Sequence, residues 1–299
     1  MTDLMTRPDY PFTPRNFAHP NGLRQSYLEE GPRDGEVVLM LHGNPSWSFY
    51  WRKLVSGLSD RYRCIVPDHM GMGLSDRPGD DRYAYTLQSR IADLDALLTH
   101  MGITGPVTLA VHDWGGMIGF GWALKHSTRV KRLVILNTSA FPLPKEKAMP
   151  LRLSMGRDSK VGGYLIRRFN LFARGAAWMG TCKHLSKDVR AAYAGVYDGW
   201  DQAISTLRFM QDIPLKPGDR AWDLVEASGK KLHDYADRPA FIGWGLKDFV
   251  FDKHFLHVFQ RALPKAHLHA FKDASHYVLE DKAEVLVPAI RAFLDRHPI

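Results

Sequence analysis

The sequence predicts an α/β fold with a mostly parallel central sheet, which is flanked by helices and carries an inserted helical cap. Short apolar runs alternate with segments of helical spacing, and this alternation indicates right-handed crossovers between parallel strands. Between residues 141 and 214 the alternation stops, and prolines open a strand-free segment rich in arginine and aromatic residues. We therefore assign residues 1–140 and 215–299 to the core and residues 141–214 to the cap.

The predicted strands are short apolar runs that end in turn residues or polar loops. Residues 1–22 are predicted to be irregular, and the first strand is placed at an edge of the sheet. The strands cover residues 23–29 (the edge strand), 36–41, 63–67, 107–111, 132–136, 239–243 and 267–271.

The predicted core helices lie between these strands and after the last one. Residues 87–101 illustrate the helical spacing, since their apolar side chains recur at three- and four-residue intervals: Ile91, Leu94, Leu97 and Leu98. The other core helices cover residues 51–58, 117–126, 252–263 and 283–296.

Composition and length fit one large α/β domain with a cap. No apolar run reaches the ~18–20 residues of a membrane span, and the first eight residues lack a signal-peptide pattern. Cys64 and Cys182 lie far apart in the sequence, so we expect free, buried thiols in a reducing compartment. We expect a cytoplasmic protein and leave membrane association open.

The positive charge is concentrated in the cap. The chain has a net charge of +8, and residues 141–214 hold twelve Lys or Arg against six Asp or Glu, a net of +6. No nucleic-acid-binding module accompanies this charge, so we expect no nucleic-acid partner. The basic cap is either a solvated helical surface or a region that attracts an anionic substrate, an anionic membrane or a partner enzyme.

One stretch organises the expected chemistry. The apolar run from Val107 turns sharply through residues 112–116, His-Asp-Trp-Gly-Gly, and continues as a helix rich in small residues. A strand, a sharp turn with one reactive side chain and a closely packed helix form a nucleophile elbow. Serine is the usual residue at its apex, whereas this chain has Asp113.

Two further residues can complete a catalytic triad with Asp113. Asp248 and His276 each follow a predicted strand, so all three side chains can meet at the carboxyl edge of the sheet. Asn137 occupies the other position where the acid could lie, but it is not a carboxylate. We therefore expect Asp113 as nucleophile, Asp248 as acid and His276 as base.

An aspartate at the elbow indicates attack on an sp³ carbon rather than ester or peptide hydrolysis. A carboxylate is already ionised at neutral pH, and its attack leaves an alkyl ester, which water activated by His276 can hydrolyse. The departing anion needs hydrogen-bond donors. Trp114 and Asn44 can each supply a side-chain and a backbone N–H.

Four motifs resemble the haloalkane dehalogenase branch of the α/β-hydrolases, and so does the order of nucleophile, acid and histidine along the chain. Asp248 as the acid with Asn44 and Trp114 as donors resembles the third dehalogenase subfamily, which also contains the β-lactone decarboxylases of bacterial long-chain olefin biosynthesis. The sequences of residues 137–144, 169–176 and 248–252 resemble these decarboxylases more than ordinary dehalogenases. The four motifs are HGNPSW at 42–47, DxxGxGxS at 68–75, HDWGG at 112–116 and ASHYVLED at 274–281.

The resemblance implies an α/β-hydrolase fold and decarboxylation of cis-3,4-dialkyl β-lactones (oxetan-2-ones) to cis-alkenes and CO₂. It implies that Asp113 is the nucleophile, that His276 and Asp248 complete the triad, and that Trp114 and Asn44 stabilise the developing carboxylate. Attack on the ring carbon and attack on the carbonyl both remain open. A long, two-tailed hydrophobic substrate accounts for the apolar cap.

Three other functions remain open. A haloalkane dehalogenase would use the same five residues to release halide from 1-haloalkanes. An epoxide hydrolase would need two cap tyrosines, for which the candidates are Tyr164, Tyr193 and Tyr197. A scaffold protein would dock other olefin-pathway enzymes on the basic cap and keep a vestigial site. Neither zinc-type His/Cys spacing nor a phosphate-binding glycine loop is present, so we expect no metal and no cofactor.

Overall fold

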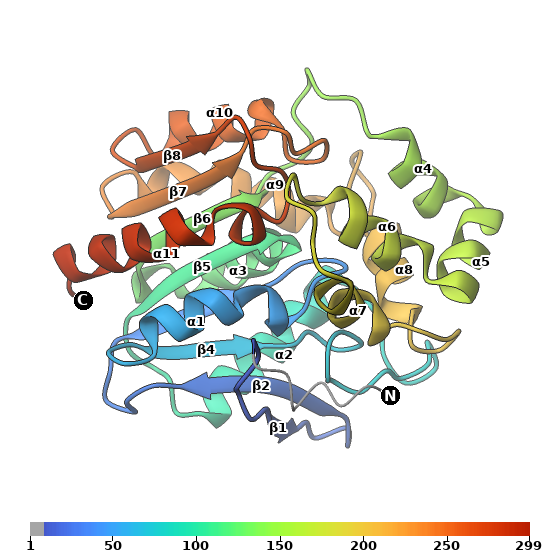
Figure 1. The fold of residues 1–299 in the computed structure, drawn as a ribbon, viewed down its shortest axis with the longest axis horizontal. Coiled ribbons are helices and arrows are strands. Elements are labelled where there is room, and N and C mark those ends of the chain that lie inside the picture. The colour runs from blue at the N-terminus through green and yellow to red at the C-terminus, as the bar shows by residue number, and fades with distance from the viewer. Residues whose placement is uncertain (1–8) are drawn as a thin grey trace.

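The computed structural model describes residues 9–299 and is built around one eight-stranded sheet (Figure 1). The strand order is β1-β2-β4-β3-β5-β6-β7-β8; β1–β2 and β2–β4 are antiparallel, and every other pair is parallel. The strands are β1 Arg15–Ala18, β2 Arg24–Glu30, β3 Val37–Leu41, β4 Arg63–Pro67, β5 Val107–Asp113, β6 Val130–Thr138, β7 Ala240–Gly245 and β8 His267–Phe271.

Helices cover both faces of the sheet, and five more form the cap segment, residues 141–214, beside one end of the sheet (Figure 1). α1 and α11 lie on one face, whereas α2, α3, α9 and α10 lie on the other. Within residues 9–299 no helix has both the length and the apolar composition that crossing a bilayer requires. The helices are α1 Arg52–Leu58, α2 Leu87–His100, α3 Trp114–His126, α4 Leu151–Asp158, α5 Lys160–Phe169, α6 Leu171–Met179, α7 Lys187–Gly195, α8 Ile204–Gln211, α9 Trp222–Lys230, α10 Lys253–Ala262 and α11 Val278–Arg296.

The central strand β5 is buried at every position, which explains its continuous apolar run. It pairs in parallel with β3 and β6, so its carboxyl end is surrounded by the ends of neighbouring strands. The pairing with β6 shifts register between His112 and Asp113, where the strand gives way to the elbow. The sheet therefore places Asp113 at its carboxyl edge.

The predicted boundaries of the strands from β3 onward agree with the structure to within two residues, but the prediction that residues 1–22 are irregular is wrong at residues 15–18. β1 lies in the stretch predicted to be irregular and pairs with β2, so β1 rather than residues 23–29 forms the edge. Phe17 is the only buried residue of this four-residue strand, which is too short to show an alternating pattern. The part of that prediction that concerns residues 1–8, including the absence of a signal peptide, lies outside the described residues.

Two further expectations need correction. α11 begins at Val278 rather than at residue 283, because a helical turn after the His276 loop precedes a break at Lys282. Both cysteines are free, but only Cys64 is buried; Cys182 is exposed because it lies in the loop between α6 and α7.

The side chain of Asp281 connects the cap segment, through hydrogen bonds, to the loop that carries His276. Its buried carboxylate accepts the backbone N–H of Cys182 at 2.9 Å and that of Lys183 at 2.8 Å, both in the cap segment. The same carboxylate accepts the N–H of Ser275 at 2.8 Å. One side chain therefore joins two segments that are almost a hundred residues apart in the sequence.

We predict that Asp281→Ala lowers the free energy of unfolding by about 3 kcal/mol, because buried N–H donors lose a charged acceptor. Urea denaturation followed by circular dichroism measures this change. Glu284→Gln on the same helix is the control, since its ion pair with Lys183 is half exposed and should contribute less than about 1 kcal/mol. A loss below about 1 kcal/mol for Asp281→Ala would contradict the anchoring role.

Candidate active site

Asp113 lies at the apex of a strand-to-helix turn with an unusual backbone conformation. Its φ of 52° and ψ of −127° are rarely adopted by residues other than glycine and cost on the order of 1–3 kcal/mol. β5 ends at this residue and α3 begins at the next one, so the carboxylate projects beyond the sheet. The hydroxyl of Thr138 donates to the Asp113 carbonyl and supports the turn.

The elbow requires glycine at two positions of close approach. A Cβ at Gly43 would lie 1.9 Å from Oδ1 of Asp113, and one at Gly115 would lie 2.0 Å from the carbonyl oxygen of Leu41. Both contacts are too short for any side chain. The glycines therefore allow the loop after β3 and the start of α3 to close around the carboxylate.

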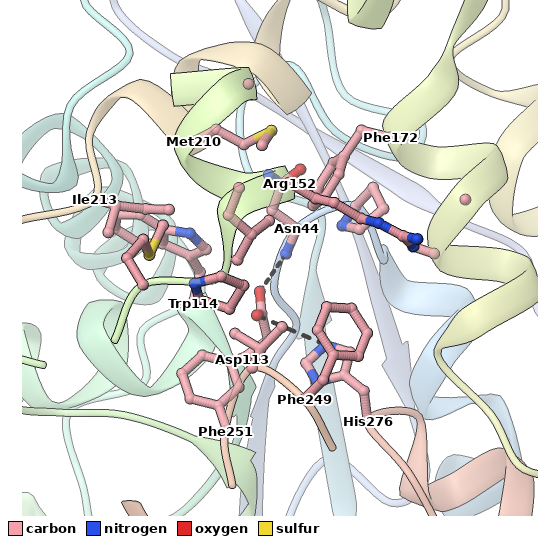
Figure 2. Close-up of a pocket in the computed structure, with 18 of the residues that line it drawn as sticks. Asn44, Asp113, Trp114, Arg152, Phe172, Met210, Ile213, Phe249, Phe251 and His276 are labelled. Atoms are coloured by element: carbon pink, nitrogen blue, oxygen red, sulfur yellow. Dashed lines mark hydrogen bonds and ion pairs between the residues drawn. The ribbon is translucent and has the colours of Figure 1, made fainter. Parts of the chain in front are cut away.

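Two backbone N–H groups bind the carboxylate of Asp113. The N–H of Asn44 donates to Oδ1 at 2.6 Å, and the N–H of Trp114 also donates to this carboxylate. Oδ2 lies 3.6 Å from Nε2 of His276 (Figure 2). This distance exceeds a hydrogen bond, so the lone pairs of Oδ2 are available for attack.

His276 and Asp248 are joined by a direct hydrogen bond. Nδ1 of His276 donates to Oδ2 of Asp248 at 2.8 Å. Oδ1 of Asp248 accepts the backbone N–H groups of Val250 at 2.8 Å and Phe251 at 3.1 Å. The structure thus brings together all three residues of the predicted triad.

Asn137 supports the acid rather than replacing it. Its Nδ2 donates to Oδ2 of Asp248 and to the carbonyl of Gly245, both at 3.0 Å, and its Oδ1 accepts the N–H of Gly245 at 2.8 Å. An amide suits this position because it must both donate and accept, which a carboxylate cannot do.

His112 is a positioning residue that sequence reasoning missed. Its Nε2 donates to the backbone carbonyl of His276 at 3.0 Å, and its ring stacks on Tyr50 with centroids 4.0 Å apart. Burial lowers the pKa of His112 well below 6.5, and the charge of His276 lowers it further, so the ring is neutral. The sequence signal was its place immediately before the nucleophile.

Burial and neighbouring charges oppose one another in the two central pKa values. Burial raises the pKa of Asp113 above 3.8, although His276 and the two backbone N–H groups oppose this rise. Burial alone would lower the pKa of His276, but Asp248 and Asp113 more than offset it and raise that pKa above 6.5. Asp248 and Asp113 therefore favour the protonated form of His276, whereas burial opposes it.

The expected donors lie at the base of the cavity, although one is partly occupied. Nδ2 of Asn44 donates one N–H to the carbonyl of Thr206 in α8 at 3.0 Å, and this contact leaves a second N–H. Trp114 packs on Phe209 and lines the cavity, and among residues 9–299 its indole nitrogen has no acceptor. Both side chains can therefore donate to an anion placed beside Asp113.

A cavity of about 350 Å³ lies between Asp113 and the cap segment (Figure 2). Its polar groups are concentrated near the nucleophile, apart from Arg152 on α4, and the other wall side chains are aliphatic, aromatic or thioether groups. Such a cavity selects apolar molecules and presents one reactive end to them. The walls include Met117, Phe141, Leu143, Met149, Leu153, Leu165, Ile166, Phe172, Met210, Ile213, Leu215, Val250, Phe251 and Phe255.

None of the three candidate tyrosines of an epoxide hydrolase lines this cavity. Tyr193 donates to Glu280 at 2.6 Å, and Tyr197 donates to the carbonyl of Ser46 at 3.3 Å, whereas Tyr164 is half exposed. Their hydroxyls are therefore not placed to protonate an oxide opened by Asp113.

Comparison with known proteins shows which family and which individual proteins this chain resembles. The family model for the alpha/beta hydrolase fold matches residues 36–283. The chain is 64% identical to the cis-3-alkyl-4-alkyloxetan-2-one decarboxylase of Xanthomonas campestris pv. campestris, over 99% of this chain and all of that protein. It is 50% identical to the protein of the same name from Shewanella oneidensis, over 94% of this chain and 88% of that protein.

A solved structure with the same fold is that of the haloalkane dehalogenase DbeA from Bradyrhizobium elkani. It aligns with a TM-score of 0.86 over 95% of this chain and 98% of its own, at 23% identity. At this identity the likeness shows the fold alone.

The pKa of Asp113 leads to a prediction about the pH dependence of kcat/KM. Attack requires the ionised carboxylate, so kcat/KM should fall about tenfold per pH unit below the pKa of Asp113. Because burial raises this pKa, the acid limb should lie above pH 3.8. Initial rates across the acid range measure the limb, and circular dichroism at each pH checks that the fold persists. Full activity down to pH 3.8 in a folded protein would contradict the prediction.

Proposed function

Since the chain belongs to the alpha/beta hydrolase fold family, we propose that it decarboxylates cis-3,4-dialkyl β-lactones to cis-alkenes and CO₂. The observation that carries this proposal is the 64% identity, along the whole chain, to a cis-3-alkyl-4-alkyloxetan-2-one decarboxylase. The elbow aspartate, the apolar cavity and the donors beside Asp113 support it.

In the first step, Oδ2 of Asp113 attacks C4 of the lactone, the sp³ ring carbon that is bonded to the ring oxygen. A new carbon–oxygen bond forms to Asp113, the strained ring C–O bond breaks, and the electron pair stays on the departing carboxylate. Both backbone N–H groups at the elbow bind the carboxylate of Asp113 itself. They are therefore not free to stabilise an oxyanion formed by attack on the lactone carbonyl, which favours attack at the ring carbon.

In the second step, the released carboxylate leaves as CO₂. The electron pair of its C–C bond forms the carbon–carbon double bond, and the ester bond to Asp113 breaks, which restores the aspartate. Inversion in the first step followed by anti elimination converts a cis-lactone into a cis-alkene. Neither step consumes water or a proton, so the apolar cavity serves to keep water from hydrolysing the ester.

The surrounding side chains have distinct proposed roles. The indole N–H of Trp114 and the remaining amide N–H of Asn44 hold the carboxylate that departs in the first step. The protonated form of His276, which Asp248 favours, lowers the pKa of Asp113 and so favours the ionised nucleophile despite burial. The cap segment forms most of the apolar walls around the alkyl chains, and core side chains such as Phe251 and Phe255 form the rest.

Hydrolysis of haloalkanes is the second candidate function. The same five residues could displace halide, and water activated by His276 could then cleave the Asp113 ester. Halide would occupy the position between Trp114 and Asn44 that the proposal assigns to the departing carboxylate.

The proposed setting is long-chain olefin biosynthesis in the cytoplasm. An enzyme that closes a β-hydroxy acid to a lactone would supply the substrate. Docking of that enzyme on the basic cap is an alternative to contact between the cap and a membrane.

We predict that the purified protein converts a cis-dialkyl β-lactone to equimolar CO₂ and cis-alkene, and releases little halide from 1-bromoalkanes. Asp113→Asn should reduce the rate at least about 10³-fold, because an amide is not a nucleophile. Gas chromatography of the alkene and ion chromatography of bromide measure the two reactions. Asp158→Asn, an exposed cap carboxylate, is the control and should keep the native rate. Comparable kcat/KM for bromoalkanes would favour the dehalogenase instead.

Trp114→Phe should lower kcat about 10²-fold and leave KM nearly unchanged, because it removes the indole donor but retains the aromatic ring. Steady-state kinetics with the lactone measure both constants. Trp178→Phe, which alters an exposed indole outside the cavity, should have no effect when the substrate is dispersed in detergent. A change below threefold in Trp114→Phe would remove the indole from the mechanism.

A further inference from the structure

The opening of the cavity is formed by apolar side chains that are also exposed to solvent. Met155 is 54% exposed, Leu171 49%, Met179 41% and Phe249 42%, and all four line the cavity. Side chains that border both the cavity and the solvent lie at its mouth. Such exposure of large apolar side chains is unfavourable in water and indicates an apolar neighbour.

This apolar surface continues outward along two cap helices. Leu151 on α4 is 75% exposed and Trp178 on α6 is 59% exposed, and neither lines the cavity. Of the twelve large hydrophobic side chains exposed within residues 9–299, nine belong to the cap segment. We name the mouth surface by its seven residues: Leu151, Arg152, Met155, Leu171, Trp178, Met179 and Phe249.

Basic side chains contact these apolar residues directly. Nη1 of Arg152 lies 2.8 Å from the thioether of Met179, and the guanidinium of Arg190 lies 4.0 Å from the ring centroid of Trp178. Among residues 9–299 neither arginine forms an ion pair with a carboxylate; Arg190 instead contacts His184 and the carbonyl of Leu185. In the view of Figure 2, Arg152 lies on the side of the cavity away from Ile213.

We propose that the mouth surface docks on an anionic lipid bilayer, so that the cavity opens toward the acyl chains. Leucine, methionine and tryptophan beside unpaired arginines form the composition that inserts at a lipid interface, with cations directed to lipid phosphates. The net charge of +6 on the cap segment adds attraction to anionic headgroups.

The position of the mouth favours a bilayer over a protein partner. A protein seated on this surface would close the opening, whereas a fluid acyl layer covers the same side chains and still exchanges apolar molecules. The cavity of about 350 Å³ is also near the small end for ligand sites, so two long alkyl chains would extend through the mouth. This last argument rests on the proposed function; the exposure and charge of the surface do not.

Vesicle flotation tests the proposal. The full-length protein should float with phosphatidylcholine vesicles that contain phosphatidylglycerol, bind at least tenfold more weakly to phosphatidylcholine alone, and dissociate as salt screens the charges. Leu151→Ser combined with Trp178→Ser should weaken binding at least about tenfold, because the two most exposed apolar side chains are lost.

Two variants separate insertion from charge and from general surface effects. Val285→Ser on α11 removes an apolar side chain that is 42% exposed but belongs to the core domain and not to the mouth surface. This variant should therefore bind vesicles like the native protein. Arg190→Gln should bind more weakly to phosphatidylglycerol vesicles and retain its weak binding to phosphatidylcholine. Detergent-dispersed lactone should be turned over equally by the native protein and the double variant, which also shows that the variant is folded.

Absence of native binding to phosphatidylglycerol vesicles, binding independent of phosphatidylglycerol, or an equal loss in Val285→Ser would overturn the proposal. Self-association, or capture of a lactone-forming enzyme, that is abolished by the double variant without any vesicle binding would assign the surface to a protein and also overturn it. If the lactone is not a substrate, the proposed function fails, whereas the flotation result stands independently.

Discussion

The site depends on two backbone N–H groups that bind the buried carboxylate of Asp113. Burying a carboxylate is costly unless hydrogen bonds and opposite charge compensate. The N–H groups come from Asn44, after β3, and from Trp114, at the start of α3, so the register of adjacent parallel strands sets their position. Oδ1 is thereby fixed, and Oδ2 faces His276 and the cavity.

The rest of the site is a chain of hydrogen bonds between strand ends. His112 holds the backbone of His276, His276 donates to Asp248, and Asp248 accepts from Asn137. Each of these side chains lies at or just after a parallel strand, so the rigid sheet supplies the reaction geometry. The cap segment supplies most of the apolar wall side chains around the nucleophile, and the core supplies the others.

Local pattern predicted most of the core and placed the five expected site residues at the carboxyl edge of the sheet, because strand ends in parallel sheets share that edge. It missed β1, whose single buried residue Phe17 carries too little periodicity. It also missed the role of His112 and the contact between Asn44 and Thr206, since these depend on distances between segments up to 164 residues apart. The solvent exposure of Leu151 and Trp178 could not be predicted from the sequence either, because an apolar residue in a helix is usually part of a core.

The bond between Asn44 and the carbonyl of Thr206 limits how this architecture can diversify. The orientation of a donor beside the nucleophile is set by a cap helix, and the cap loop at residues 182–183 is in turn tied to Asp281 next to the histidine loop. A chimaera with a transplanted cap would need to reproduce the carbonyl of Thr206 and the backbone N–H groups of Cys182 and Lys183. The cap is therefore not an interchangeable module, and selectivity and reactivity in this chain must evolve together.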